Sequence, residues 1–326
     1  MSVPQFNRYI SLKIGGTDVE GIDLSDLRIR FSVRRGDLST PNSADIRVYN
    51  VSAETARKSQ LREFERVVLQ AGYPGNYGTI FDGTIKQVRR GRESQTDTYI
   101  DITAADGDSA YNFAVTNKTL AAGSSPEEQI RAVMKDFEAK GVTLGALPGL
   151  PKSRLPRGKV IFGMTRDQLD TWGRTMDISW SIQDGQLTLI PNIAYLPGEA
   201  VVVNAETGMV GLPEQTQNGI TVRTLLNPGI RIGRMLQLNN RSIQLYRYGI
   251  GISDQASNQW VYNTAFLDAD GFYRPIVVNH YGDSRGSDWY TNVICLAIDA
   301  TFPPGLIKYS TEPGGVGAVG PVKPYG

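Results

Sequence analysis

The sequence of 326 residues has few of the residue types that most enzyme chemistry requires. It contains one cysteine, Cys295, and one histidine, His280. A single cysteine excludes an internal disulfide and any cysteine-rich metal site. A single histidine leaves one possible base for a Ser-His-Asp or Cys-His arrangement. These absences disfavour nucleophilic catalysis before any motif is considered.

Net charge and long apolar runs are missing as well. Lysine and arginine total 34 and aspartate and glutamate 33, so the formal net charge is +1. Charge alone therefore predicts no general attraction to nucleic acid or to an anionic membrane. No run of about 18 apolar residues exists to span a bilayer, and the N-terminus lacks the pattern of a signal peptide. We expect no membrane anchor and assembly in a cytoplasm.

The residues that are abundant favour short strands and turns. There are 35 glycines and 17 prolines, together with many Val, Ile, Thr and Tyr. Apolar and polar residues alternate in 9–14 and 27–33, and 43–50 reads as a third strand, which is followed by a short helix at 53–61 capped by Ser52. We predict a mainly β fold of the α+β class.

The middle of the chain carries the strongest helix signals. Ser125-Pro-Glu-Glu128 is a capping box that predicts a helix near 126–140. Thr165-Arg-Asp-Gln168 has the same pattern and predicts a second helix near 166–177. Residues 178–190 read as a hairpin whose central Asp-Gly pair suits a type I′ turn. The proline-rich stretch 145–159 reads as an exposed loop.

The last third repeats the order of an earlier region. A turn at 227–229 precedes a predicted strand at 230–238, and 276–278 and 289–298 read as strands joined by the loop 282–286, whose glycines permit positive φ. Three earlier segments match later ones in character: 64–72 with 234–238, 78–88 with 271–278, and 97–106 with 288–299. A repeat of two units indicates duplication within one globular chain, which suggests two related antiparallel barrels.

The strings at 225–233 and 278–291 resemble the second barrel of baseplate hub proteins from contractile-tailed, Mu-like bacteriophages. The resemblance covers roughly the whole chain. It implies a homotrimeric ring around the DNA path, with two tube-like barrels per subunit, between a hexameric tail tube and a trimeric central spike. Tube or tube-initiator proteins, the spike and neighbouring baseplate proteins are the implied partners, and the virion tail is the implied location.

The repeat and the middle helices together predict four regions. We expect a first tube-like β-barrel domain at 1–112, a middle α/β domain at 113–205, a second tube-like β-barrel domain at 206–302 and a Gly/Pro-rich tail at 303–326. Ordering such a tail needs apolar contacts with a neighbouring subunit or the spike. Truncation after Ser310 should therefore leave both barrels folded and weaken this docking.

The surroundings of His280 invite a hydrolase interpretation, because Asp283, Ser284 and Asp288 follow closely. We favour a structural role, because side chains of one hairpin alternate between opposite faces. Metal binding by His280 and Asp283 lacks further ligands at a readable spacing. No catalytic, cofactor-binding or metal-binding residue is assigned, and no cofactor is expected.

Seven arginines make the first predicted barrel locally basic: Arg28, Arg30, Arg34, Arg35, Arg89, Arg90 and Arg92. Their pattern allows a phosphate-binding patch or a solvated, lumen-lining face. We favour the second interpretation, because no aromatic stacking residues interleave with these arginines. Sequence-specific nucleic-acid binding is not expected.

An alternative function is a β-barrel carbohydrate-binding or cell-wall-degrading tail module. Exposed aromatic residues at Trp260, Tyr262, Trp289 and Tyr290 could form a sugar platform. Aromatic residues in strands are more often part of the core, which favours the structural hub over this alternative.

Overall fold

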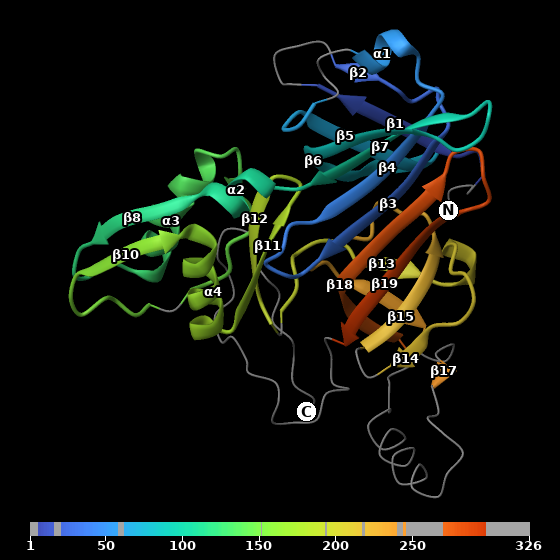
Figure 1. Cartoon of the computed structure of the whole chain (residues 1–326). Coiled ribbons are helices and arrows are strands. Elements are labelled where there is room, and N and C mark those ends of the chain that lie inside the picture. Colours follow the sequence, from blue (N-terminus) through green and yellow to red (C-terminus); the bar gives the residue numbers. More distant parts are fainter. Residues whose placement is uncertain are drawn as a thin grey trace, which may run out of the picture.

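A computed structural model describes residues 6–15, 21–57, 62–150, 152–192, 194–216, 219–239, 244–245 and 270–297 (Figure 1). The fold is mainly β, which confirms the expected class. No helix in these ranges is both long and apolar enough to span a bilayer. The helices are α1 (Ala53–Arg57), α2 (Asp108–Phe113), α3 (Pro126–Glu138) and α4 (Thr165–Met176), with a 3₁₀ turn at Ala205–Thr207.

The largest sheet has 14 strands and consists of two halves, and residues 6–105 form the first half. Its hydrogen-bonded order is β3-β4-β7-β6-β5-β1-β2. Inward side chains of these strands form a hydrophobic cluster, and in β3 buried and exposed residues alternate from Ile29 to Arg34. The strands are β1 (Tyr9–Ile14), β2 (Ile22–Asp23), β3 (Ile29–Gly36), β4 (Ser43–Tyr49), β5 (Arg66–Tyr73), β6 (Asn76–Arg92) and β7 (Thr98–Ala105).

The second half, residues 194–297, repeats this strand order. Its neighbours run β14-β15-β19-β18-β16-β13, which matches β3-β4-β7-β6-β5-β1 strand for strand. The duplication predicted from the sequence is therefore confirmed in the pairing order. The strands are β13 (Val201–Val203), β14 (Glu214–Thr216), β15 (Gly219–Leu225), β16 (Leu236–Asn239), β17 (Gln244–Leu245), β18 (Asp270–Asp283) and β19 (Trp289–Ala297).

A shared irregularity supports the correspondence. The register of β6 against β7 shifts between Ile85 and Gln87, and that of β18 against β19 shifts between Pro275 and Val277. Each shift is a β-bulge in the long strand of its half. The halves differ at one edge, where β1 pairs with β5 antiparallel and β13 pairs with β16 parallel.

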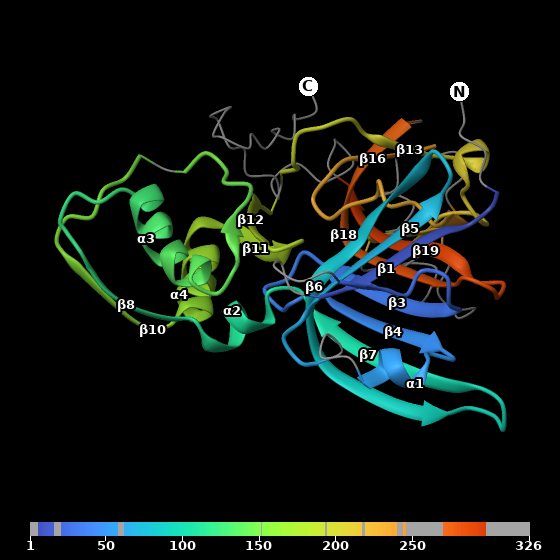
Figure 2. The same cartoon turned by 90° about the horizontal axis from the view of Figure 1, so that it is seen from above.

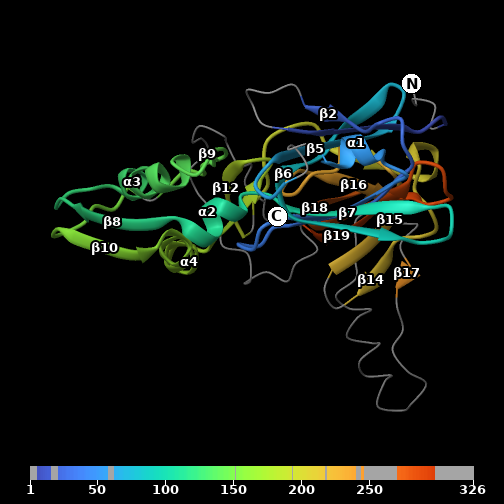
Figure 3. The same ribbon diagram turned by 45° about the horizontal axis from the view of Figure 1, so that its top comes forward.

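The two halves join edge to edge through β18 and β3. Residues 277–283 of β18 pair antiparallel with 30–36 of β3. This joint places both halves in one continuous sheet, with β14 and β17 at the opposite end from β5 and β2 (Figure 3). The sequence did not predict this pairing.

The middle segment, residues 107–192, projects away from the large sheet (Figures 1 and 2). Two small sheets and helices α2 to α4 surround a separate hydrophobic cluster that includes Phe137 and Trp180. The predicted hairpin is confirmed, since Asp184 and Gly185 both have positive φ, as a type I′ turn requires. The strands are β8 (Val115–Leu120), β9 (Thr143–Leu144), β10 (Lys159–Met164), β11 (Ile178–Gln183) and β12 (Gln186–Pro191).

One of the two predicted capping boxes is wrong. Ser125 caps α3 as expected, and its hydroxyl accepts from the backbone N–H of Glu128. The N-cap of α4 is Met164, so Thr165 already lies inside the helix. The hydroxyl of Thr165 is buried and lies 3.0 Å from that of Thr116. A tertiary hydrogen bond therefore takes the place of the predicted local cap.

Two expectations for the second half are also corrected. The strand predicted at 230–238 begins only at Leu236, because an Asx turn at Asn227 and a positive φ at Gly233 bend the chain before it. The glycines of the 282–286 loop do not have positive φ. A Cβ on Gly282 would lie 2.5 Å from Trp289, so this glycine is needed for close packing.

A buried polar network attaches the middle segment to both halves. Arg274 of β18 pairs with Asp37 at 3.0 Å and donates to the carbonyls of Pro191 and Ala194. Asp106 accepts the backbone N–H groups of Asp184 and Gly185 at the tip of the β11–β12 hairpin. Burial raises the pKa of Asp106 to about 6. These bonds fix the base of the projecting segment.

Candidate functional site

The candidate site is the polar face, defined as the side of β7, β4, β3, β18, β19 and β15 that points away from the hydrophobic clusters. Alternation along each strand places these side chains on one face, because successive residues point to opposite sides. The face crosses the joint between the halves without interruption. Its residues include Tyr99, Asp101, Thr103, Asp45, Arg47, Arg30, Ser32, Arg34, Asn279, Tyr281, Tyr290, Asn292 and Arg223.

One row on this face runs straight across four strands. Arg34 is paired with Asn279, Asn279 with Asn292, and Asn292 with Arg223. The side-chain oxygens of both asparagines are buried and have no hydrogen-bond partner among the described residues. Two guanidinium groups thus flank a pair of neutral amides.

The corresponding row of the first half runs Arg89, Asp101, Arg47 and Arg30, so it contains an acid between two of its arginines. Arg47 binds the carboxylate of Asp101 through two bonds, of 2.7 and 2.9 Å. It also lies over the ring of Tyr99 at 4.0 Å. In the second half Arg223 lies over Tyr290 at 4.1 Å, while Asn292 stands where Asp101 stands in the first half. The duplication keeps the cation–π pair and replaces the acid with an amide.

The predicted arginine cluster does not form one patch. Arg35 is buried and bonds to Gln183 and Asp184, while Arg28 pairs with Asp283 at 2.6 Å. Arg30 and Arg34 are exposed on the polar face. Within the described part of the chain, no hydrogen bond or ion pair engages the guanidinium of Arg30, Arg34 or Arg223.

The expectation that no aromatic residues lie among the arginines is wrong for the polar face. Tyr281 and Tyr290 do interleave with the arginines, since Arg223 lies over both rings. Sequence analysis missed Arg223, because it is separated from the basic cluster by more than a hundred residues. Only the pairing order of the two halves brings it onto the same face as Arg34.

His280 does not assemble a catalytic triad. Its side chain is buried, and its Nδ1 lies 2.9 Å from the hydroxyl of Thr291. Desolvation lowers the pKa of His280 to about 3, so the ring is neutral. The nearby acid and hydroxyl are used elsewhere, because Asp283 binds Arg28 and Ser284 accepts the backbone N–H of Ile29. The structural interpretation of this histidine therefore fits its contacts.

The other candidate residues are structural where the structure describes them. Cys295 is buried, and burial raises the pKa of its thiol. Trp289 is 1% exposed and donates its Nε1–H to the carbonyl of Gly72, so it cannot serve as a sugar platform. Trp260, Tyr262 and the tail at 303–326 lie outside the described residues. Among the described residues, no cluster of acid, histidine and cysteine side chains has the geometry of a metal site.

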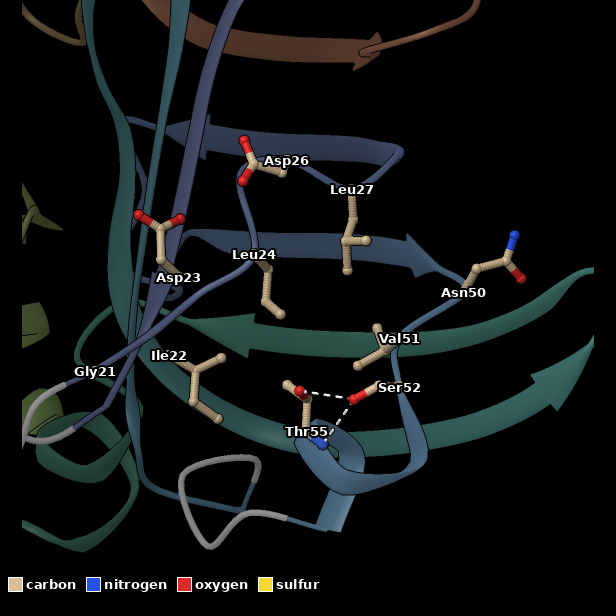
Figure 4. Close-up of a pocket in the computed structure, with 10 residues that line it drawn as sticks. All are labelled: Gly21, Ile22, Asp23, Leu24, Asp26, Leu27, Asn50, Val51, Ser52 and Thr55. Atoms are coloured by element: carbon tan, nitrogen blue, oxygen red, sulfur yellow. Dashed lines mark hydrogen bonds between the residues drawn. The ribbon is translucent and has the colours of Figure 1, made fainter.

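A pocket of about 530 Å³ lies apart from the polar face, between β2 and α1 (Figure 4). Ile22, Leu24 and Val51 supply apolar lining. Ser52 caps α1 through the backbone N–H of Thr55, and a hydrogen bond from Ser25 lowers the pKa of Asp23. These polar groups are already satisfied within the fold, so the pocket offers no evident acid–base pair.

Comparisons with known proteins identify the fold. No protein-family profile and no curated protein sequence matches the chain. Among solved structures, the 43 kDa tail protein of prophage MuSo2 from Shewanella oneidensis aligns with a TM-score of 0.55 at 7% identity, covering 89% of this chain and 97% of that one. The tail protein from Neisseria meningitidis MC58 aligns with a TM-score of 0.54 at 10% identity, covering 89% and 96%.

A third similar structure comes from a secretion machine. It is an Escherichia coli component of the type VI secretion system that exhibits structural similarity to the T4 bacteriophage tail proteins gp27 and gp5. The TM-score is 0.52 at 12% identity, and the alignment covers 91% of this chain and 80% of that one. The chain therefore has the fold of phage tail proteins, which confirms the resemblance at the level of the fold.

Proposed function

We propose that the chain is a structural baseplate hub protein that forms a homotrimeric ring between the tail tube and the central spike of a contractile tail. The observation that carries this proposal is the duplicated half. Two like halves per chain and three chains provide six similar units, which suits a junction between sixfold and threefold components. We propose the same four regions for this hub, with the middle domain bounded at 107–192, because α2 packs in the middle cluster and β13 pairs with β16. We propose no enzymatic role.

The joint inside the chain suggests how the ring closes. In β18, residues 270–273 pair with β16 and 277–283 pair with β3 along the same edge. In β6, the edge that pairs with β5 and the residues before it ends at Ile85, and no described strand covers the rest of it to Arg92. Since β6 corresponds to β18 and β14 to β3, this open edge would receive β14 of the next copy. The two-residue strand β17 now pairs with β14 and would have to shift.

Backbone direction identifies a residue that tests this joint. Glu93 donates its N–H to Asp97 across the β6–β7 turn. Because successive residues of a strand point their N–H groups in opposite directions, the N–H of the neighbouring Arg92 points to the open edge. Proline at this position removes that donor and leaves the pairing with β7 intact.

Native mass spectrometry of the purified chain should find a trimer. Arg92→Pro should shift it to the monomer, and the matched variant Arg92→Ala, which keeps the N–H, should remain trimeric. A stable dimer, or a chain that is monomeric even within the assembled tail, would refute the proposed hub function. An Arg92→Pro trimer as stable as the wild type would refute this joint.

A further inference from the structure

We propose that the polar face binds the sugar-phosphate backbone of double-stranded DNA through Arg34 and Arg223, with Arg30 as a third contact. The proposal rests on the hub function, because a ring around the DNA path brings this face and the DNA together. It goes further in assigning a contact that is independent of base sequence to named residues. The lumen would then bind the DNA weakly at these guanidinium groups.

The spacing of the arginines indicates a polymeric anion. Adjacent strands lie about 4.8 Å apart, so the three strand steps between Arg34 and Arg223 separate their Cα atoms by about 14 Å. Along β3, Arg30 and Arg34 are about 13 Å apart. A single phosphate or carboxylate could contact two of these groups only if both side chains bent toward each other over the intervening residues. A ligand with regularly repeated charges can contact all three.

Charge balance indicates which part of the face would bind. In the first-half row, Asp101 forms an ion pair with Arg47 and lies opposite Arg89 on its other side. In the row that contains Arg34 and Arg223, the intervening residues are Asn279 and Asn292, which carry no charge. The guanidinium groups of this row are therefore available to an external anion, and they can form charge-assisted hydrogen bonds to phosphate oxygens.

The shape of the site favours DNA over an acidic peptide. Peptide recognition generally uses pockets for alternate side chains, whereas phosphate contacts need only exposed donors. The pocket described above is lined by residues of 21–27 and 50–55 and lies away from the row. Tyr281 and Tyr290 are half-buried beneath Arg223, so they are not free platforms for unpaired bases.

The direct test is a titration of a fluorescent DNA duplex of mixed sequence at several salt concentrations. Each phosphate contact contributes about 0.9 to the slope of log affinity against log salt. Arg34→Gln with Arg223→Gln removes two contacts per subunit, so it should reduce this slope by about 2 for each subunit that contacts the duplex, or about 5 for the whole ring, and weaken binding roughly tenfold or more at about 0.1 M salt. Arg34→Lys with Arg223→Lys should preserve the slope.

A matched control removes the same charge elsewhere. Arg131→Gln with Arg174→Gln changes two exposed arginines of α3 and α4 and should leave the affinity unchanged. Equal losses in both double variants, no binding by the wild type, or equal displacement of DNA by polyglutamate of matched charge would overturn the assignment. Native mass spectrometry of the same samples, and titration of monomeric Arg92→Pro, separate failure of the DNA contact from failure of the ring.

Discussion

The two halves of the large sheet have the same strand order, yet they use equivalent positions differently. Arg47 lies opposite Asp101 in the first half, and Arg223 lies opposite Asn292 in the second. Asn292 of β19 is therefore the equivalent of Asp101 of β7. In this alignment Trp289 corresponds to Thr98. Trp289 belongs to the hydrophobic cluster of the first half, together with Leu226. The second half thus contributes part of its own sequence to the core of the first, and we infer that the halves depend on each other for stability.

The largest expected effect tests this dependence. Trp289 packs edge-on against Phe31, with ring centroids 5.3 Å apart. Trp289→Ala should lower the free energy of unfolding by about 3–5 kcal/mol, because it leaves a cavity inside the joint. Chemical denaturation measures the change. Tyr290→Ala, on the polar face of the same strand, is the control, and a loss as large as that of Trp289→Ala would contradict the shared core.

Acid stability should separate two buried groups, Asp106 at the base of the middle segment and His280 in the second half. Because the pKa of Asp106 is raised to about 6, its folded form holds a proton that the unfolded form releases near pH 4. Its contribution is largest below pH 4 and is lost as the pH rises through 6, by about 3 kcal/mol in total. His280 acts in the opposite sense, because its lowered pKa makes stability present above pH 6.5 and lost as the pH falls toward 3.

Two substitutions resolve these opposing contributions between pH 4 and 6. Asp106→Asn should make the protein lose stability more steeply on acidification than the wild type. His280→Gln should make it lose less stability on acidification. The same variant should leave assembly nearly intact, because the imidazole bonds to Thr291 within its own hairpin. Denaturant titrations at several pH values measure both slopes. Wild-type slopes in both variants would show that neither group titrates as its burial implies.

The smallest effect concerns the polar face. Asn292→Asp gives the second half the acid that the first half has at Asp101, and places it beside Arg223. Because the half-buried acid gains the exposed Arg223 as a partner but loses contact with water, the two contributions largely offset, and the free energy of unfolding should change by about 1 kcal/mol or less. The affinity for the DNA duplex should fall, since Arg223 gains an internal partner. An affinity equal to that of the wild type would argue against Arg223 as a phosphate contact.

The sequence predicted those features that depend on local residue order. The capping box at Ser125, the Asp-Gly turn at 184–185 and the matching of 78–88 with 271–278 all follow from short-range patterns, and the structure contains them. It could not predict the β18–β3 joint or the row from Arg34 to Arg223, because these depend on which strand edges meet. Thr165 shows the same limit, since its hydroxyl bonds to a distant threonine and not to its own helix.

In the proposed hub, three copies close a ring by repeating between chains the β18–β3 joint that links the two halves. Asn279 faces Arg34 in that joint, and the same register places Arg89 opposite Thr216 of the next copy. Paired Cα atoms in antiparallel strands lie about 4.5–5.5 Å apart, within the range of a disulfide. We predict that Arg89→Cys with Thr216→Cys forms a covalent trimer on oxidation, seen on a non-reducing gel. Only monomers, or an open ladder of higher oligomers, would contradict the ring.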